Sequence, residues 1–482
     1  MGEKNVGSIK ILDAVQCHAT AAAKSLFLKS LSYQEKVYRP AKWQRTANGK
    51  AIRIPAQNDL VSKYFITGGV KQSGYFYSGL LPRVKEAIEK SDGDATISGE
   101  LERVEPETLK VNLNGITLRR DQRVAVKRAM RRQRGVILFP TGSGKTIIAT
   151  ALIKHFMRQH RIVFLVHTLD LLKQTAEEFT RFGVPHKVLG GNKKIDPESF
   201  QYEEAVTLVS TIQSFSRFME RTDLKTFFDI TIVDEVHHAA KIDSMYGKWM
   251  THNLSPMRIG FTATMPSNEK ERLTVEGLFG PVISELKNEE GVKIGILAKP
   301  RVNLFAVPYE AGVYRKARKK TYLDIYEWCL VKNPTRNKLI VDKAIARIKR
   351  NRVVLIIVES IRHGKRLKRM FRRKKIVCPF VEGDSEKAYR DRVRHGLKSK
   401  RLKVAICTRV WKEGINIPSL NTIILAAGQK EEKGVKQAMG RGLRVAEGKR
   451  RIELIDFMDP YKYLAEHSVA RFTIYKELRW LK

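Results

Sequence analysis

Residues 136–146 read Val-Ile-Leu-Phe-Pro-Thr-Gly-Ser-Gly-Lys-Thr, and this stretch decides the fold. Its apolar first half predicts a buried strand, and residues 147–157 predict a helix. The glycine-rich loop between them therefore presents backbone N–H groups at a helix N-terminus, where the helix dipole favours an anion. The order strand, loop, helix is typical of a parallel α/β sheet with a phosphate site at one edge.

The residues of this loop suit separate tasks in a phosphate site. Its glycines let the backbone wrap a phosphate without a Cβ clash. Lys145 can reach the β- and γ-phosphates, and Thr146 can hold Mg²⁺ through its hydroxyl. The pattern predicts ATP with Mg²⁺, although Phe139 stands where the usual pattern has its first glycine. The predicted phosphate-binding residues are Thr141, Gly142, Ser143, Gly144, Lys145 and Thr146.

Two adjacent carboxylates end a second apolar run, residues 230–233. At the C-terminal end of a strand, Asp234 can bind Mg²⁺ through water, and Glu235 can orient and deprotonate an attacking water. A lone Asp-Glu pair is usually a solvated turn. The apolar strand before the pair and the phosphate loop upstream favour the catalytic interpretation here.

With these two segments the chain resembles the superfamily two helicases of the DEXH type, from Leu118 to the C-terminus. Residues 118–122 are similar to the segment that contacts adenine through a glutamine, here Gln122. Residues 261–264 resemble the motif that couples hydrolysis to movement. The resemblance implies nucleic-acid backbone contacts from His167, Thr168, Ser210 and Thr211, and coupling by Thr262, Thr264, His237 and Gln437.

The second half of the chain carries further signatures of the same family. Residues 354–360 resemble motif four, and residues 405–418 resemble motif five, with Asn416 in place of the more usual aspartate. Residues 437–444 match the spacing Gln-x-x-Gly-Arg-x-x-Arg of motif six. The resemblance implies nucleic-acid contacts from Ser360 and Thr408, and nucleotide contacts from Gly414 and Asn416.

Two arginines of motif six have a physical role in this prediction. Phosphoryl transfer spreads negative charge over the γ-phosphate oxygens, and an arginine aimed there raises the rate by about 10³- to 10⁵-fold. Arg441 and Arg444 are three residues apart, so on a helix they would share one face. We expect them to reach a nucleotide held by the first motor domain, so that hydrolysis requires domain closure. The alternative is that both form surface ion pairs only.

Short apolar strands alternate with helical stretches in two sets along the chain. We therefore predict an α/β protein with two tandem RecA-like, doubly wound parallel-sheet domains and a small N-terminal α+β domain. The predicted domains are residues 1–115, 116–300 and 301–482, with a hinge region at 291–300 and a polar helical connector at 314–328. The expected strands are 136–139, 162–166, 205–209, 231–233 and 259–262, then 353–358, 375–380, 404–407, 422–426 and 452–456.

The chain carries a formal net charge of +41, which attracts polyanions and speeds their encounter. Nucleic acid is the natural partner, and we predict forked, branched or duplex DNA, with single-strand-binding or recombination proteins as further candidates and no membrane. Any single basic cluster is more often a solvated helix face, but their sum favours nucleic-acid binding. The clusters are 119–134, 315–320, 347–352, 365–375 and 398–403.

The N-terminal region interleaves aromatic and basic residues, which suits base stacking and neutralisation of a phosphate backbone. The equally good alternative is that the aromatics form the core of a small domain. The aromatic residues are Tyr33, Tyr38, Trp43, Tyr64, Phe65, Tyr75, Phe76 and Tyr77.

Cysteine usage and hydropathy indicate the compartment. The four cysteines are scattered without ligand spacing, which supports neither a zinc site nor a disulfide framework and predicts a reducing interior. No apolar stretch approaches the roughly 18 residues that span a bilayer, and the N-terminus lacks the apolar core of a signal peptide. We therefore expect the protein in the cytoplasm of a bacterium or of a phage-infected host.

The leading functional prediction is an ATP-dependent DNA helicase or junction translocase. Within the superfamily the chain resembles phage branch-migration enzymes and XPB-like repair helicases, on residues 138–140, 277–281, 295–300 and 467–475. This resemblance implies work on forks or junctions in replication, recombination or repair. The alternatives are an RNA helicase, the motor subunit of a restriction system, and a non-catalytic polyanion-binding protein that uses ATP as a clamp.

Overall fold

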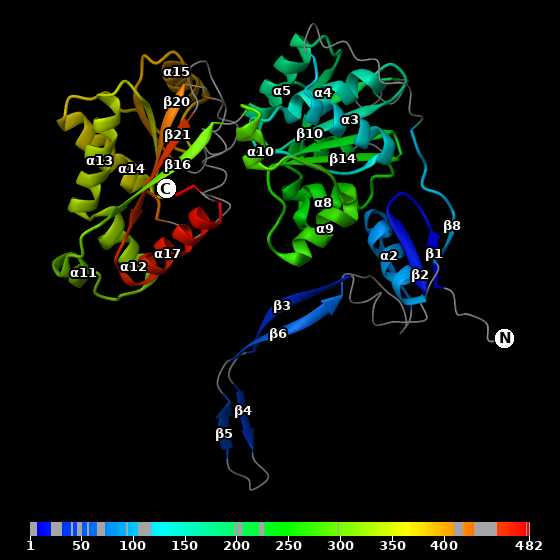
Figure 1. Ribbon diagram of the computed structural model, residues 1–482, viewed down its shortest axis with the longest axis horizontal. Coiled ribbons are helices and arrows are strands. Elements are labelled where there is room, and N and C mark those ends of the chain that lie inside the picture. Colours follow the sequence, from blue (N-terminus) through cyan, green and yellow to red (C-terminus); the bar gives the residue numbers. More distant parts are fainter. Residues whose placement is uncertain are drawn as a thin grey trace. The chain divides into compact units, whose positions relative to one another are not determined.

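The chain forms three layered sheet systems in the computed structural model (Figure 1). Apart from loop 140–144, it divides after Glu285 into two compact units. The structure describes residues 7–20, 31–39, 42–45, 51–54, 57–64, 73–92, 95–104, 117–196, 200, 205–220, 226–296, 298–408, 417, 419–428, 451–478 and 480–481.

The first unit is built on a parallel sheet of seven strands in the order β11-β12-β10-β13-β14-β9-β15. Its inner strands β10, β12 and β14 are buried along their whole length, as expected for a sheet covered on both faces. The strands are β9 (Arg134–Leu138), β10 (Ile162–Val166), β11 (Lys187–Leu189), β12 (Thr207–Thr211), β13 (Ile230–Asp234), β14 (Met257–Thr262) and β15 (Val282–Glu285).

Helices cover both faces of this sheet (Figure 1). One layer holds α3 (Arg120–Arg132), α4 (Lys145–Phe156) and α5 (Leu169–Arg181). The other holds α7 (Ile212–Met219), the short helix η2 (Val236–Ala240), α8 (Met245–Met250) and α9 (Glu269–Phe279), whose apolar residues pack together against the sheet. The arrangement is the doubly wound fold predicted from the sequence.

A small N-terminal α+β module belongs to the same unit. Its four-stranded sheet has the order β7-β2-β1-β8, and α2 (Leu81–Asp92), entered through the single turn η1 (Ser78–Leu80), packs on it. Leu273 of α9 joins the apolar core of the module, so the module is packed on the first motor domain. The strands are β1 (Gly7–Ile11), β2 (Gln16–Thr20), β7 (Ser73–Tyr77) and β8 (Ala95–Ser98), and two antiparallel ribbons pair β3 (Ser32–Arg39) with β6 (Gln57–Tyr64) and β4 (Lys42–Arg45) with β5 (Ala51–Ile54).

The second unit contains a parallel sheet of six strands in the order β16-β21-β20-β17-β19-β18. Helices α13 and α14 pack on one face, and α15 and α17 on the other. Its strands are β16 (Lys299–Ala306), β17 (Val353–Ile357), β18 (Phe380–Val381), β19 (Val404–Cys407), β20 (Leu420–Leu425) and β21 (Arg451–Met458). Its helices are α13 (Pro334–Ile348), α14 (Ile361–Arg373), α15 (Lys387–Lys398) and α17 (Lys462–Glu477), preceded by α10 (Asn288–Lys293), α11 (Ala311–Lys316), α12 (Tyr322–Ile325) and the π-helical turn η3 (Tyr326–Val331).

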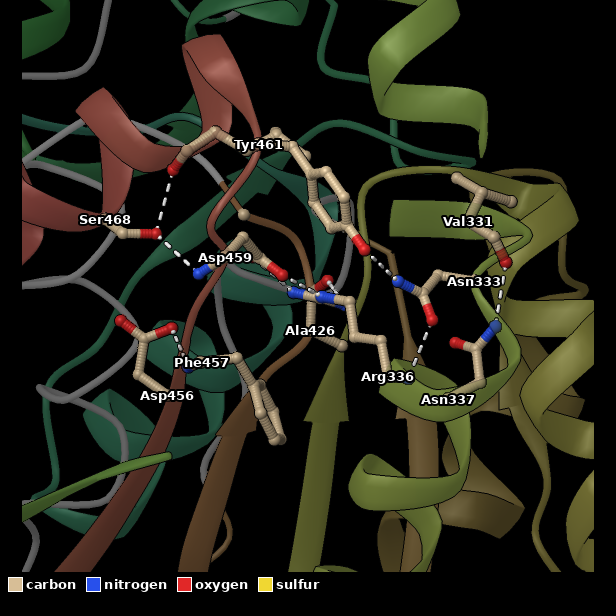
Figure 2. Close-up of polar contacts among 12 residues, drawn as sticks. Val331, Asn333, Arg336, Asn337, Ala426, Asp456, Phe457, Asp459, Tyr461 and Ser468 are labelled. Atoms are coloured by element: carbon tan, nitrogen blue, oxygen red, sulfur yellow. Dashed lines mark hydrogen bonds and ion pairs between the residues drawn. The ribbon is translucent and has the colours of Figure 1, made fainter. Parts of the chain in front are cut away.

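A buried ion pair holds the carboxyl ends of two of these strands together. Arg336 and Asp459 are both fully buried, and the guanidinium makes two hydrogen bonds to the carboxylate, at 2.7 and 3.1 Å. Figure 2 shows this pair, with Arg336 also donating to the carbonyl oxygen of Ala426, just after β20. Asp459 N–H in turn donates to Ser468 of α17. The network therefore joins the start of α13, the ends of β20 and β21, and α17.

The structure also shows where the predicted elements lie. Residues 291–300, predicted as a hinge region, contain the end of α10 at Lys293 and the start of β16 at Lys299. Polar and apolar residues alternate from Arg301 to Leu304 of β16, so the apolar run of this strand is limited to its last three residues. Residues 375–380 were expected as a strand, but only Phe380 and Val381 pair, with β19.

The connector at 314–328 is helical as predicted, and it also has a small core of its own. Val313, Ala317, Ile325 and Cys329 pack with Leu464 of α17. No helix in the described ranges has the length and apolar character needed to cross a bilayer.

Candidate nucleotide site

Four neighbouring strands of the first sheet bring the predicted site residues to one edge. In the order β10-β13-β14-β9 they are all parallel, so their carboxyl ends lie side by side. These ends lead into His167, into the pair Asp234 and Glu235, into Thr262, and into the phosphate loop. A crevice outside the carboxyl ends of parallel strands is where α/β folds bind ligands.

The phosphate loop is held at both ends. Phe139 N–H donates to the carbonyl oxygen of Thr262 at 3.0 Å, and Ser143 turns back to bond the carbonyl oxygen of Pro140 through N–H and hydroxyl. Gly142 and Gly144 have φ angles of 87° and 90°, a region that favours glycine. Phe139 needs no such φ and is buried in the core, which explains how it replaces the usual glycine.

Lys145 begins α4 and extends back along the loop. Its Nζ donates to the carbonyl oxygen of Phe139 at 3.3 Å and lies 4.0 Å from Oε1 of Glu235. The lysine therefore stands between the loop that would hold phosphates and the predicted catalytic carboxylate.

The two carboxylates differ in environment. Glu235 has a left-handed backbone (φ 52°, ψ 51°), and its N–H donates to Oδ1 of Asp234 at 3.0 Å. Desolvation, together with the neighbouring Glu235 charge, raises the pKa of Asp234. Desolvation acts in the same direction on Glu235, but the Lys145 ammonium and the His237 ring outweigh it and hold the pKa of Glu235 below its usual value. Of the two carboxylates, Glu235 is therefore the more readily ionised, and an ionised carboxylate can accept a proton.

His237 connects Glu235 to the end of β14. Its Nδ1 lies 3.3 Å from Oε2 of Glu235 and 3.0 Å from the hydroxyl of Thr262. The Thr262 hydroxyl donates to the carbonyl oxygen of Thr264 at 3.0 Å, so it accepts from Nδ1–H of His237. Thr264 N–H closes the turn on the same hydroxyl at 3.3 Å. A continuous polar chain therefore runs from the carboxylate to residues 262–264.

Sequence reasoning missed a stack of rings beside this chain. His167 and His238 lie face to face, with ring centroids 4.0 Å apart and planes within 8°, and Tyr246 stacks 6.4 Å from His238. His238 also lies 4.4 Å from the ring of His237. The doubled histidine at 237 and 238 was the only sequence signal for this contact between the carboxylate loop and the loop after β10.

Other predicted residues have local structural roles. Thr168 and Thr211 cap α5 and α7, accepting from Leu171 N–H and Ser214 N–H. Ser210 is fully buried, and its hydroxyl donates to the carbonyl oxygen of Leu189. Its side chain is therefore not exposed for contact with nucleic acid. Gln122 is also buried, in the first turn of α3, where its Oε1 accepts from Arg119 N–H at 3.1 Å.

In the second unit, Ser360 and Thr408 follow the neighbouring strands β17 and β19 at the carboxyl edge of the sheet. Ser360 is partly exposed at the start of α14, and Thr408 is nearly buried, with its N–H donating to the carbonyl oxygen of Val381 at 3.1 Å. The remaining predicted residues lie outside the described part of the chain: Gly414, Asn416, Gln437, Arg441 and Arg444.

Two family descriptions match the chain over the two parallel-sheet regions. Residues 115–267 match the res subunit of type III restriction enzymes, and residues 336–446 match the helicase conserved C-terminal domain. The chain belongs to the superfamily two helicases. Its family makes it an ATP-dependent nucleic-acid helicase.

The relatives of this helicase include viral and archaeal proteins. It is 25% identical to a protein described as a helicase of the Sulfolobus islandicus filamentous virus, over 70% of this chain and 62% of that protein. It is 22% identical to the DNA 3'-5' translocase XPB2 of Sulfurisphaera tokodaii, over 68% of this chain and 79% of the relative. It is 21% identical to the ATP-dependent DNA helicase uvsW of Enterobacteria phage T4, over 74% of both chains.

The fold of the helicase is similar to that of solved motor domains. A fragment of an HsdR subunit of a type I restriction enzyme from Vibrio vulnificus superposes with a TM-score of 0.55 at 19% identity, covering 72% of this chain and 65% of that fragment. The similarity concerns the fold alone.

The residues at the sheet edge fit a phosphate-bound magnesium ion. The described residues contain no cluster of three or more His, Cys, Asp or Glu side chains that could hold a metal. Thr146 and Asp234 would therefore share the ion with phosphate oxygens and water. Mg²⁺ is commonly bound in this way, through one or two carboxylates plus substrate phosphates, rather than in an all-protein cage.

Proposed function

We propose that this helicase is an ATP-driven DNA motor that unwinds or branch-migrates forked or junction DNA. The observation that carries the proposal is the polar chain from Lys145 and Glu235 through His237 to Thr262. Groups that would touch the nucleotide are thereby bonded to the turn at 262–264. Through these contacts, hydrolysis of the nucleotide can shift the backbone of this turn.

Each residue of the edge has one task in the proposed reaction. Lys145 and the loop N–H groups bind the phosphates, while Thr146 and Asp234 hold Mg²⁺. When bound, Mg²⁺ would supply positive charge that offsets the negative charge of the phosphates. Glu235, being ionised, orients the attacking water and accepts its proton.

The residues of motifs five and six complete the proposal. Gly414 and Asn416 contact the nucleotide, and Arg441 and Arg444 stabilise the charge that develops on the γ-phosphate. Gln437 joins His237 in coupling the nucleotide to the nucleic-acid track. These roles rest on the motif spacing.

DNA is the substrate that the relatives and the charge favour. The archaeal and phage T4 relatives are named for DNA translocation and DNA unwinding. The net charge of +41 supports tight, salt-sensitive binding to a phosphate backbone. Preference for forks or junctions rests on the resemblance to phage branch-migration enzymes and XPB-like repair helicases. Helix α9 follows the 262–264 turn, and its Leu273 packs into the N-terminal module, so the turn and the module are joined.

The restriction-enzyme alternative has one observation in its favour. The family match at residues 115–267 and the HsdR fragment are both named for restriction enzymes. A restriction motor would translocate on duplex DNA without separating strands. An RNA helicase would be stimulated by RNA, and a passive ATP-clamped binder would be stimulated by no nucleic acid.

A catalytic variant tests the chemistry. Glu235→Gln keeps the volume of the side chain but removes the charge that accepts the proton, so we expect normal ATP binding and a loss of turnover of at least about 100-fold. The measurement is steady-state ATPase activity together with binding of a fluorescent ATP analogue. Turnover at the parent rate in this variant would contradict the assignment.

A panel of nucleic acids tests the substrate. ATPase activity and strand displacement are measured with linear duplex, forked DNA, a four-way junction and RNA. The proposal expects DNA to stimulate hydrolysis and branched DNA to be unwound or migrated best. Stimulation by linear duplex without displacement would favour the restriction motor, RNA stimulation the RNA helicase, and no stimulation the passive binder.

A further inference from the structure

A pocket rich in arginine lies in the second unit, at the end of the sheet opposite to the motif residues. Its volume is about 680 Å³, and it is lined by five arginines but only one carboxylate, Glu453. The lining comes from the neighbouring strands β16, β21 and β20, from the end of α13 and the turn after it, and from Arg352 just before β17. The arginines are Arg301, Arg347, Arg350, Arg352 and Arg451.

Strand register explains why these side chains meet. Arg301, Asn303 and Phe305 alternate along β16, so they lie on one face of the sheet. Arg301 pairs in register with Glu453 of β21, which pairs in turn with Thr422 of β20. Helix α13 covers the apolar part of the same face and ends at Ile348, so the amino-terminal part is lined by polar side chains.

The floor of the pocket is internally neutralised. Glu453 is only 8% exposed and binds Arg347 through two hydrogen bonds, at 2.7 and 3.2 Å, with Arg352 at 3.1 Å and Thr422 at 3.2 Å. Desolvation opposes its charge, but the neighbouring arginines hold the pKa of Glu453 below its usual value. The carboxylate is therefore ionised and already shared between two arginines.

The rim of the pocket is different, because its arginines have no acidic partner among the described residues. Arg301, Arg350 and Arg451 are exposed, and none of them makes an ion pair with a carboxylate in the described part of the chain. Arginine presents a planar fork of donors that matches phosphate oxygens. Three such forks around one opening form a receptor for phosphate groups.

The side chains that could read a nucleobase are already in use. Asn303 donates to Glu453, Asn421 accepts from Val353 N–H, and the ring of Phe305 is covered by the Lys343 ammonium at 3.8 Å. Among the described residues, the pocket lining also includes no glycine-rich loop or helix N-terminus of the kind that grips a free nucleotide. Its chemistry fits the phosphates of a strand, which carry no base information.

We propose that this pocket is an auxiliary site for the phosphate backbone of DNA, separate from the strand contacts of the motor motifs. It lies at the amino end of β17, whereas Ser360 follows its carboxyl end, on the order of 16 Å away along five residues of strand. DNA held there would remain attached while the motif residues at the carboxyl ends of the β-strands release and rebind it. The inference rests on the proposed function, because it takes DNA as the partner.

Charge reversal of the rim tests the site. In the full chain, Arg301→Glu, Arg350→Glu and Arg451→Glu are combined. The floor of the pocket and the candidate nucleotide site of the first sheet are left unchanged. We expect DNA affinity to fall about tenfold or more at 0.1 M salt. The slope of log affinity against log salt should become shallower by about 0.9 for each duplex phosphate that the rim no longer neutralises. ATPase activity without DNA should stay at the parent level.

A matched control separates a local site from net charge. Lys338→Glu, Arg392→Glu and Lys476→Glu reverse three exposed charges of the same unit, outside the pocket lining and outside the basic clusters of the sequence. Long-range effects of the two triples are similar and are screened beyond about 10 Å at 0.1 M salt. Equal losses of affinity and slope in both triples would overturn the proposal. If the rim triple melts at a lower temperature, the single change Arg350→Glu, in the exposed turn after α13, repeats the test with an expected slope change of about 0.9.

The remaining outcomes distinguish the possible failures. A parent protein that binds no DNA at any salt concentration contradicts the proposed function. A parent that binds DNA with the same slope as the rim triple contradicts the auxiliary site alone. Pyrophosphate is added at constant ionic strength as a last probe. If it raises the melting temperature of the parent but not of the rim triple, while the two proteins show equal salt slopes for DNA, the pocket binds free phosphates. That outcome would overturn the proposal.

Discussion

Thr262 is the residue that connects the phosphate loop, His237 and the 262–264 turn in the candidate nucleotide site. Its carbonyl oxygen accepts from Phe139 N–H at the start of the phosphate loop, and its hydroxyl joins His237 to Thr264. The side chain is fully buried, so these bonds form away from water, where losing a partner is costly. One hydroxyl thereby connects the carboxylate loop to the turn before α9.

Removing that hydroxyl tests the coupling role. In Thr262→Val the shape is kept, so we expect ATP binding and basal hydrolysis to remain within about threefold. DNA-stimulated strand displacement should fall at least about tenfold, because the hydroxyl that joins His237 to Thr264 is lost. Thr262→Ser keeps the hydroxyl and should restore displacement. A valine variant that displaces strands at the parent rate would show that the turn is not part of the coupling.

At the scale of elements, the N-terminal module is joined to the motor domain by Arg134. This buried side chain donates to the hydroxyl of Ser78 and to the carbonyl oxygens of Ala14 and Pro256. Burial lowers the pKa of Arg134 to about 10, so it stays charged at neutral pH. Three segments from two sheets therefore share one cation.

Replacing Arg134 should loosen this joint. Arg134→Met leaves buried oxygens without a donor, and we expect a loss of about 1–3 kcal/mol in the free energy of unfolding. Hydrogen exchange of the β2 amides should become faster. Arg132→Met, at an exposed position of α3, is the control and should change the stability by less than about 0.5 kcal/mol. Equal stability of the two variants would mean that Arg134 does not hold the module.

The second sheet has its own joint in the pair Arg336–Asp459 (Figure 2). Breaking a buried pair leaves an uncompensated charge, so Asp459→Asn should cost about 3–5 kcal/mol in the free energy of unfolding, measured by urea denaturation. Asp342→Asn, on the exposed face of α13, is the matched control with little expected change. A change of less than about 1 kcal/mol in the free energy of unfolding of Asp459→Asn would show that Arg336 finds other hydrogen-bond acceptors.

At the scale of the whole molecule, hydrolysis is expected to need residues from both motor domains. The nucleotide edge lies in the first parallel sheet, and the arginines of motif six follow β20 in the second. The high net charge acts over the entire surface and favours encounter with DNA, but it supplies no catalytic group.

Arg444→Ala tests this dependence in the full chain. Loss of an arginine aimed at the γ-phosphate should lower kcat by about 10³-fold or more with little change in ATP binding. Arg401→Ala, at an exposed position of the same domain, should leave kcat unchanged. The measurement is single-turnover hydrolysis at saturating DNA. A kcat within about threefold of the parent would assign the transition-state charge to another group.

Much of the fold and of the site was readable from local patterns. A continuous apolar run predicts a buried strand, a glycine-rich loop predicts a phosphate site, and the Asp-Glu pair predicts a metal-binding strand end. Each of these predictions depends only on residues that are neighbours in the chain. The strands at 162–166 and 404–407 have the predicted limits. Edge strand β16 was missed because the polar residues Arg301 and Asn303, which line the pocket, interrupt its apolar residues.

Tertiary structure alone decided which distant residues became partners. His167 and His238 stack, Leu273 enters the N-terminal core, and five arginines surround Glu453 because parallel strands and packed helices bring separate segments together. Ser210 shows the converse, since a motif position became a buried structural hydroxyl. The sequence by itself determined the family and the chemistry of the phosphate loop, whereas contacts between segments far apart in the chain depend on sheet order and packing, which no local pattern encodes.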